Sequence, residues 1–216
     1  MVRSVECRCG GYVSYPRLEC CRIAKACRGL QLVDASGWGR MLPLGLRELR
    51  TLVHLATLRL RGSRVCDDAV QALCGTRHGA DTTGLGPTEQ RASAVLSLRC
   101  LDLGGNPLIS DSGVGAVAAA CPELQALYLG GFGDERHKIA ASARSGCLVT
   151  DAGVEVLARS CRDLRIVSLV ACTSLSTQSL CCIGKHLRRV EQVCTVFGCV
   201  FHLCIAMMNA HLVCTH

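Results

Sequence analysis

Residues 121–129 read CPELQALYL, and residues 161–169 read CRDLRIVSL. Each stretch has a cysteine, a leucine three positions later, and aliphatic residues six and eight positions after the cysteine. In the first stretch Tyr128 separates the last two leucines. Neighbouring side chains of a strand point to opposite faces. The stretch therefore predicts a short strand with Leu127 and Leu129 inside and Tyr128 outside.

The same spacing recurs along the chain with a period of about 26 residues. Copies begin at residues 27, 52, 95, 121, 161 and 187, at separations of 25, 43, 26, 40 and 26 residues. The two long intervals contain segments rich in glycine and polar residues, 75–91 and 132–146, which we interpret as surface insertions. Repetition at a fixed period indicates stacked units that share one core. Positions 58, 101, 127 and 167 should then lie side by side.

A second motif follows the strands. Residues 109–114 read ISDSGV and residues 149–154 read VTDAGV, and both open an apolar stretch that predicts a helix. The aspartates, Asp111 and Asp151, suit the positive end of a helix dipole. The predicted N-cap residues are Ser110, Thr150 and Ser176. Small polar residues able to hydrogen-bond a turn follow three of the strands, at Ser63, Asn106 and Cys172. Each unit is thus a strand, a turn and a helix.

The combined pattern, C-x-x-L-x-x-L-x-L followed by I-[ST]-D-x-G-[VL], resembles the cysteine-containing leucine-rich repeats of F-box/LRR proteins. The resemblance implies an α/β fold, a right-handed solenoid forming a horseshoe segment, with about six strand–turn–helix repeats and a parallel sheet on the concave face. It divides the chain into an N-terminal segment with a capping helix (1–26), the repeats (27–192) and a hydrophobic, Cys-rich last repeat or cap (193–216).

An F-box is not found ahead of the repeats. We therefore expect either a relative without an F-box, similar to the mitotic-exit antagonist family, or a fragment of a longer protein. In both cases the resemblance implies a non-catalytic scaffold for protein–protein interaction. Its finer form is an adaptor or substrate-recognition subunit in SCF-type ubiquitin-dependent degradation, with ubiquitin ligase components among the partners.

Open solenoids generally bind their partners on the concave face. Strand alternation predicts that this face carries Asp34, Arg59, Arg61, Asp102, Tyr128 and Ser168, with Cys194 ending the row. We expect a mixed-charge groove in which Arg59 and Tyr128 anchor a protein partner, because Arg and Tyr are enriched at interface hot spots. The alternative is an ordinary solvated sheet face.

Composition and motifs exclude several functions. Half of the residues are hydrophobic, so the chain can fold, and 3% are aromatic, too few for the stacking platforms that bind nucleic acid. The sequence has no P-loop, G-x-S-x-G, H-E-x-x-H or dinucleotide motif, so we predict no enzymatic activity and no cofactor. Without a visible export signal, the eighteen cysteines are expected to be thiols in a cytoplasmic or nuclear protein.

Two alternative functions concern the termini. Residues 193–214 are mostly apolar and follow a basic stretch, a pattern that suits a membrane anchor displaying the repeats to the cytosol. A metal- or redox-linked protein would use the terminal cysteines, although their spacing is irregular for zinc. These candidates are Cys7, Cys9, Cys20, Cys21, Cys194, Cys199, Cys204, His211 and Cys214. Cys121 and Cys161 instead occupy a packing position of the repeat and should be buried thiols.

Overall fold

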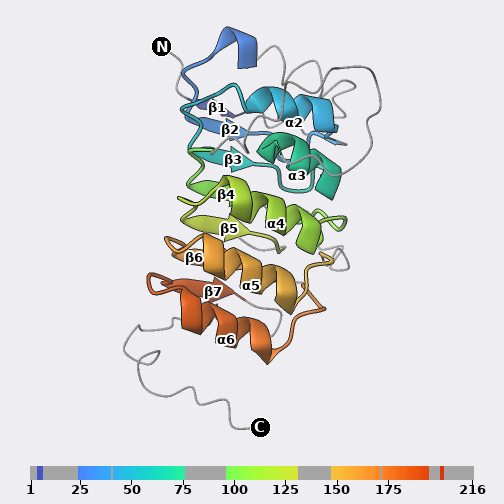
Figure 1. Ribbon diagram of the computed structural model, residues 1–216. Helices are drawn as coiled ribbons and strands as arrows, with labels where there is room; N and C mark the ends of the chain where they lie inside the picture. Colours follow the sequence, from blue (N-terminus) through green and yellow to red (C-terminus); the bar gives the residue numbers. More distant parts are fainter. Residues whose placement is uncertain are drawn as a thin grey trace, which may run out of the picture.

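The computed structural model describes residues 4–6, 24–39, 41–75, 96–130, 147–170, 172–194 and 200–201. These residues form an eight-stranded sheet whose strands lie side by side in chain order, from β1 to β8. Figure 1 shows the strands one beside another in chain order, with the helices in a single layer along one side of the sheet. The predicted α/β solenoid with a parallel sheet is confirmed.

Among the described residues, six strands and five helices make up the repeats. The strands are β2 (Leu32–Asp34), β3 (Thr57–Arg59), β4 (Cys100–Asp102), β5 (Ala126–Tyr128), β6 (Ile166–Ser168) and β7 (Gln192–Cys194). The helices are α2 (Pro43–Leu49), α3 (Asp67–Cys74), α4 (Asp111–Ala120), α5 (Asp151–Ser160) and α6 (Thr177–His186). Helices of successive repeats pack against one another, so both layers run the length of the stack.

Two further strands lie at the ends of the sheet. β1 (Ser4–Glu6) pairs parallel with β2, and β8 (Val200–Phe201) pairs antiparallel with β7. Neither strand carries the leucine spacing of the repeats, which is why the sequence did not indicate them. Residues 24–26 are helical, ahead of the first repeat.

The strand register decides the fold. Leu58, Leu101, Leu127 and Val167 occupy matching positions on β3 to β6, and all four are fully buried. They belong to one hydrophobic core that extends from Ala24 to Val193. Each repeat can thus bury its apolar face only against its neighbours, as the sequence predicted.

Cysteines fill part of this core. Cys121 and Cys161 are fully buried at the C-caps of α4 and α5, which confirms their prediction as packing residues. Burial raises the pKa of the Cys161 thiol to about 12, so it stays neutral. Its Sγ donates a hydrogen bond to the Cys121 carbonyl oxygen at 3.3 Å. A thiol at this position therefore packs like an apolar group and still satisfies a carbonyl of the preceding repeat.

Three aspartates at helix starts connect the successive repeats from α3 to α6. We call them the aspartate ladder: Asp67, Asp111 and Asp151. The Asp111 carboxylate accepts hydrogen bonds from the backbone N–H and the hydroxyl of Thr150, at 2.7 and 2.6 Å. Asp67 binds Ser110 in the same way, and Asp151 binds Ser176. The three hydroxyls also cap α4, α5 and α6, as predicted. The contact between repeats, however, was not predicted.

The glycine of the D-x-G motif makes room for this ladder. A Cβ atom on Gly113 or Gly153 would overlap an Oδ1 atom of Asp67 or Asp111. The Gly113 N–H also donates to Asp67 Oδ1 at 3.1 Å. The motif [ST]-D-x-G therefore serves two contacts between repeats. Its aspartate accepts hydrogen bonds from the next repeat, and its glycine leaves space for the aspartate of the preceding repeat.

Some predictions fall outside the described residues. The insertion 132–146 lies outside entirely, as does 75–91 apart from Gly75. The boundaries 1–26, 27–192 and 193–216 stay predictions. In the predicted anchor, the described residues belong to the strands β7 and β8. No helix within the described parts of the chain is long and apolar enough to span a membrane.

Candidate functional site

The sheet face opposite the helices is made of two rows of side chains. The middle residue of each strand points into the core, so the first and third residues point to the other face. The leading row contains the first residues: Leu32, Thr57, Cys100, Ala126, Ile166 and Gln192. The trailing row contains the third residues: Asp34, Arg59, Asp102, Tyr128, Ser168 and Cys194.

The trailing row has the register that strand alternation predicts. Its burial alternates, because Asp34, Asp102 and Ser168 are buried whereas the other three side chains are half-buried. Among the predicted site residues, only Arg59 and Tyr128 therefore offer substantial surface. Partner binding by any of the six stays a prediction, and the buried ones have contacts within the chain.

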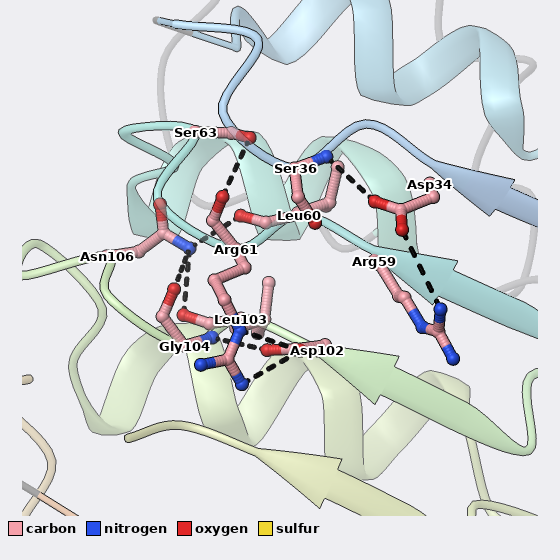
Figure 2. Close-up of polar contacts among 10 residues, drawn as sticks. All are labelled: Asp34, Ser36, Arg59, Leu60, Arg61, Ser63, Asp102, Leu103, Gly104 and Asn106. Atoms are coloured by element: carbon pink, nitrogen blue, oxygen red, sulfur yellow. Dashed lines mark hydrogen bonds and ion pairs between the residues drawn. The ribbon is translucent and has the colours of Figure 1, made fainter. Parts of the chain in front are cut away.

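Asp34 is held from two directions. Its Oδ1 accepts a hydrogen bond from the Ser36 N–H at 3.1 Å, and its Oδ2 lies 3.7 Å from Arg59 Nη1 (Figure 2). The Asp34 side chain is 3% exposed, whereas that of Arg59 is 35% exposed. The negative charge of the buried Asp34 carboxylate is thus balanced by the partly exposed Arg59 guanidinium on the next strand. Arg59 still carries further N–H donors.

Arg61 and Asp102 form a second ion pair between neighbouring repeats. Arg61 Nε donates to Asp102 Oδ2 at 3.1 Å, and Nη2 lies 3.1 Å from the same oxygen. The Gly104 N–H donates to Asp102 Oδ1 at 2.9 Å. Both ionic side chains are largely buried. Arg61 follows β3 by two positions, and its side chain lies against Asp102 of the neighbouring strand β4 (Figure 2).

Asn106 and Ser63 fix the turns beside these ion pairs. The Asn106 amide donates to the carbonyls of Leu60 and Leu103 at 2.9 and 2.8 Å (Figure 2). Its oxygen accepts from the Val65 N–H at 2.9 Å. The Ser63 hydroxyl donates to the Ala35 carbonyl at 2.7 Å. The predicted role of small polar residues in these turns is confirmed. Because buried turn carbonyls are satisfied in this way, the loop that carries Arg61 has a defined position.

The leading row was not singled out from the sequence. All six of its side chains are half-buried, and none is charged. The signal was available, because each leading residue lies two positions before a trailing one. The two rows together divide the face into a charged half on β2 to β4, whose charges pair with one another, and an uncharged half on β5 to β7.

Tyr128 lies where the two halves meet. Burial raises the pKa of its phenol above the usual value, and Cys100 and Asp102 add to this effect. The hydroxyl therefore stays protonated at neutral pH and can both donate and accept a hydrogen bond. Burial likewise raises the pKa of the Cys100 thiol in the adjacent strand. Both groups are therefore neutral on this face at neutral pH.

The described residues contain no group of three or more His, Cys, Asp or Glu side chains placed to hold a metal ion. Most terminal cysteines proposed for such a site lie outside the described residues, and Cys194 ends the trailing row. The six predicted site residues are thus brought to one face, where four of them form the two ion pairs.

A family model described as a leucine-rich repeat matches residues 96–118, which include β4 and most of α4. No curated protein matches. Among solved structures, the crystal structure of the leucine-rich repeat-containing protein LegL7 from Legionella pneumophila is similar over 89% of this chain, with 15% sequence identity and a TM-score of 0.47. This chain covers 57% of the LegL7 chain.

Proposed function

We propose that this chain is a non-catalytic scaffold that binds another protein on the sheet face opposite its helices. The observation that carries the proposal is the leading row, whose side chains stay half-exposed on six adjacent strands. Leucine-rich repeat proteins generally act in protein–protein interaction, and extended solenoid faces suit this task. Covering a half-exposed, largely apolar stripe of this length with a partner lowers the free energy of the system.

The uncharged half on β5 to β7 is the part of the face best suited to contact. Removing charged groups from water costs free energy, and on β2 to β4 a partner would have to cover or separate existing ion pairs. Ala126 and Ile166 carry no such cost. Tyr128 adds a neutral hydroxyl at the centre, and Arg59 offers donors at the margin. The partner would therefore present an apolar segment with few charges.

Photocrosslinking tests this location. A photoreactive amino acid replaces Ile166 on the face in one variant, and Val156 on α5 in a matched control. Val156 is 47% exposed and Ile166 is half-buried, so both side chains reach solvent. We expect protein adducts from position 166 and not from position 156. Adducts from position 156 alone would place the interface on the helix layer and contradict the proposal.

A binding measurement with the captured partner gives the energetic test. Tyr128→Ala should weaken binding by roughly thirtyfold, the effect of a hot-spot residue that contributes about 2 kcal/mol. Val156→Ala should leave binding unchanged. Affinity that is insensitive to Tyr128 would remove this side chain from the interface. Because the contact is largely uncharged, we also expect the affinity to change little with salt.

The finer proposal is an adaptor or substrate-recognition subunit in SCF-type ubiquitin-dependent degradation, acting in the cytoplasm or nucleus. Its support is the resemblance of the repeats to those of F-box/LRR proteins. Mass spectrometry of proteins that co-purify with the chain tests it, and ligase components are expected in stoichiometric amounts. A stoichiometric partner unrelated to ubiquitin transfer, recovered without ligase components, would contradict this role but not the scaffold itself.

A further inference from the structure

Exposed leucines gather at one edge of the stack, where the chain passes from a strand into the following helix. Among the described residues, six large hydrophobic side chains are exposed, and two of them, Val53 and Val156, lie in the loop after α2 and within α5. The other four, which we call the leucine edge, are 39–58% exposed: Leu42, Leu44, Leu108 and Leu148. The exposed apolar surface is thus concentrated at one edge of the stack.

Leu108 and Leu148 hold equivalent positions in successive repeats and face the same side. Each lies two positions before the N-cap of its helix, Ser110 or Thr150. Leu148 forms a parallel β-bridge with Ser110, and its N–H donates to the Ile109 carbonyl at 2.7 Å. Ile109 is fully buried, so Leu108 and Ser110 on either side of it point outward. Leu148 points outward beside Ser110, and the two leucines are neighbours on one surface.

The same edge is negatively charged. Arg64 is the one exposed cation among the described residues that link a strand to the next helix. The N-terminus of a helix carries only about half a positive charge. Both are outweighed by the carboxylates at the starts of α3, α4 and α5: Asp67, Asp68, Asp111 and Asp151. Asp68 is exposed and makes no hydrogen bond or ion pair within the described residues, so its carboxylate can meet a cation from outside.

The charge of the leucine edge decides which occupant fits it. Anionic lipid headgroups and the phosphates of nucleic acids would be repelled by the aspartates. A two-fold dimer through this edge would bring the same aspartates face to face. A protein segment that carries both apolar and basic side chains gains twice, because the leucines are removed from water and the carboxylates face cations.

We propose that the leucine edge binds a segment of another protein that is rich in apolar residues and in Lys or Arg. The apolar side chains cover Leu108 and Leu148, and a basic side chain pairs with Asp68. This site lies at the start of the helices and not on the sheet face opposite them, so it is a second interaction surface. Neither of the two surfaces depends on the other.

Fluorescence anisotropy with the full chain tests the chemistry of the occupant. The probes are three labelled peptides of equal length, in which leucine alternates with lysine, leucine with glutamate, or serine with lysine. We expect the leucine–lysine peptide to bind at least about tenfold more tightly than the other two, and its affinity to fall as salt rises. Equal affinity for either of the other peptides would overturn the proposal.

Variants with matched controls locate the contact. The double variant Leu108→Ser, Leu148→Ser should bind the leucine–lysine peptide about tenfold more weakly, because two apolar side chains no longer contribute to the contact. The control is Val53→Ser with Val156→Ser, at positions that are 67% and 47% exposed, and it should keep the wild-type affinity. Equal affinities of the two double variants would overturn the proposal.

The charge of the edge is tested separately. Asp68→Asn should weaken binding of the leucine–lysine peptide severalfold, whereas Glu123→Gln should not, because Glu123 is exposed in the loop before β5 at the opposite edge. Circular dichroism confirms folding, and Asp68→Asn decides the proposal if the leucine variant does not fold. Ile166→Ser should leave the affinity unchanged, and a loss at this position instead would place the peptide on the sheet face and overturn the leucine edge as its site.

Two measurements without peptide examine the other occupants. Sedimentation velocity at increasing concentration detects self-association, and pelleting with phosphatidylserine vesicles detects binding to an anionic membrane. We expect neither to depend on Leu108 and Leu148. Self-association or vesicle binding that the double serine variant loses would give the leucine edge to a second copy or to lipid, and would overturn the proposal.

Discussion

Replacing Asp111 by alanine tests whether the aspartate ladder holds the repeats together. Two hydrogen bonds from Thr150 to the carboxylate would be lost, at 2.7 and 2.6 Å. Bonds to a charged group contribute about 1.5–3 kcal/mol each when buried. Asp111 and Thr150 are only half-buried, so water compensates part of the loss. We expect Asp111→Ala to lower the free energy of unfolding by about 2–4 kcal/mol.

The chain provides a control of the same kind. Asp163 also bridges two repeats, through Arg189 Nη1 at 2.6 Å, but its side chain is 45% exposed and that of Arg189 is 65% exposed. Exposed ion pairs contribute about 0–1 kcal/mol, so Asp163→Ala should change stability little. Urea unfolding followed by circular dichroism at 222 nm, a wavelength that reports helix, gives both values. If Asp111→Ala costs no more than Asp163→Ala, the ladder does not stabilise the stack.

Three further predictions concern the core, the buried ion pair and pH. Leu127→Ala should cost about 2–5 kcal/mol in thermal or urea unfolding, and Tyr128→Ala far less, because only Leu127 is fully buried; similar costs would contradict the strand alternation. Asp102→Ala should cost about 3–5 kcal/mol by removing the carboxylate from the buried Arg61 guanidinium, and a neutral effect would mean that water replaces it. Burial opposes ionisation of Asp151, but hydrogen bonds from Ser176 and Ser179 outweigh it and lower its pKa below 3.8, so its contribution is present above that value and lost as pH falls through the folded pKa. Asp151→Asn should therefore flatten the loss of stability below about pH 4, and an unchanged acid limb would contradict this.

Much of the fold could be predicted from the sequence because the same leucine pattern occurs in several repeats. The leucine spacing fixes which residues face the core, and parallel stacking then leaves one register in which Leu58, Leu101 and Leu127 coincide. The N-caps were accessible for the same reason. β1 and β8 were not, because Ser4–Glu6 and Val200–Phe201 pair with repeat strands without carrying the repeat pattern.

The candidate site was predicted less completely than the fold. Alternation places Asp34 and Asp102 on the open face, but their burial depends on where arginine side chains from the neighbouring repeat lie. Arg59 and Arg61 are only two positions apart, yet one stays partly solvated and the other is buried. The spacing of residues in the sequence does not determine which of the two arginine side chains is buried. The ladder contacts of Asp111 were missed because a dipole argument considers one helix at a time.

The aspartate ladder also holds successive repeats at the same distance, however many residues connect them. Asp67 and Ser110 are 43 residues apart, Asp111 and Thr150 are 39 apart, and Asp151 and Ser176 are 25 apart. The corresponding carboxylate–N–H distances are nevertheless 2.9, 2.7 and 2.9 Å. We therefore expect that further peptide, including an engineered epitope or binding loop, can be inserted between these units while the hydrogen bonds of the ladder are kept.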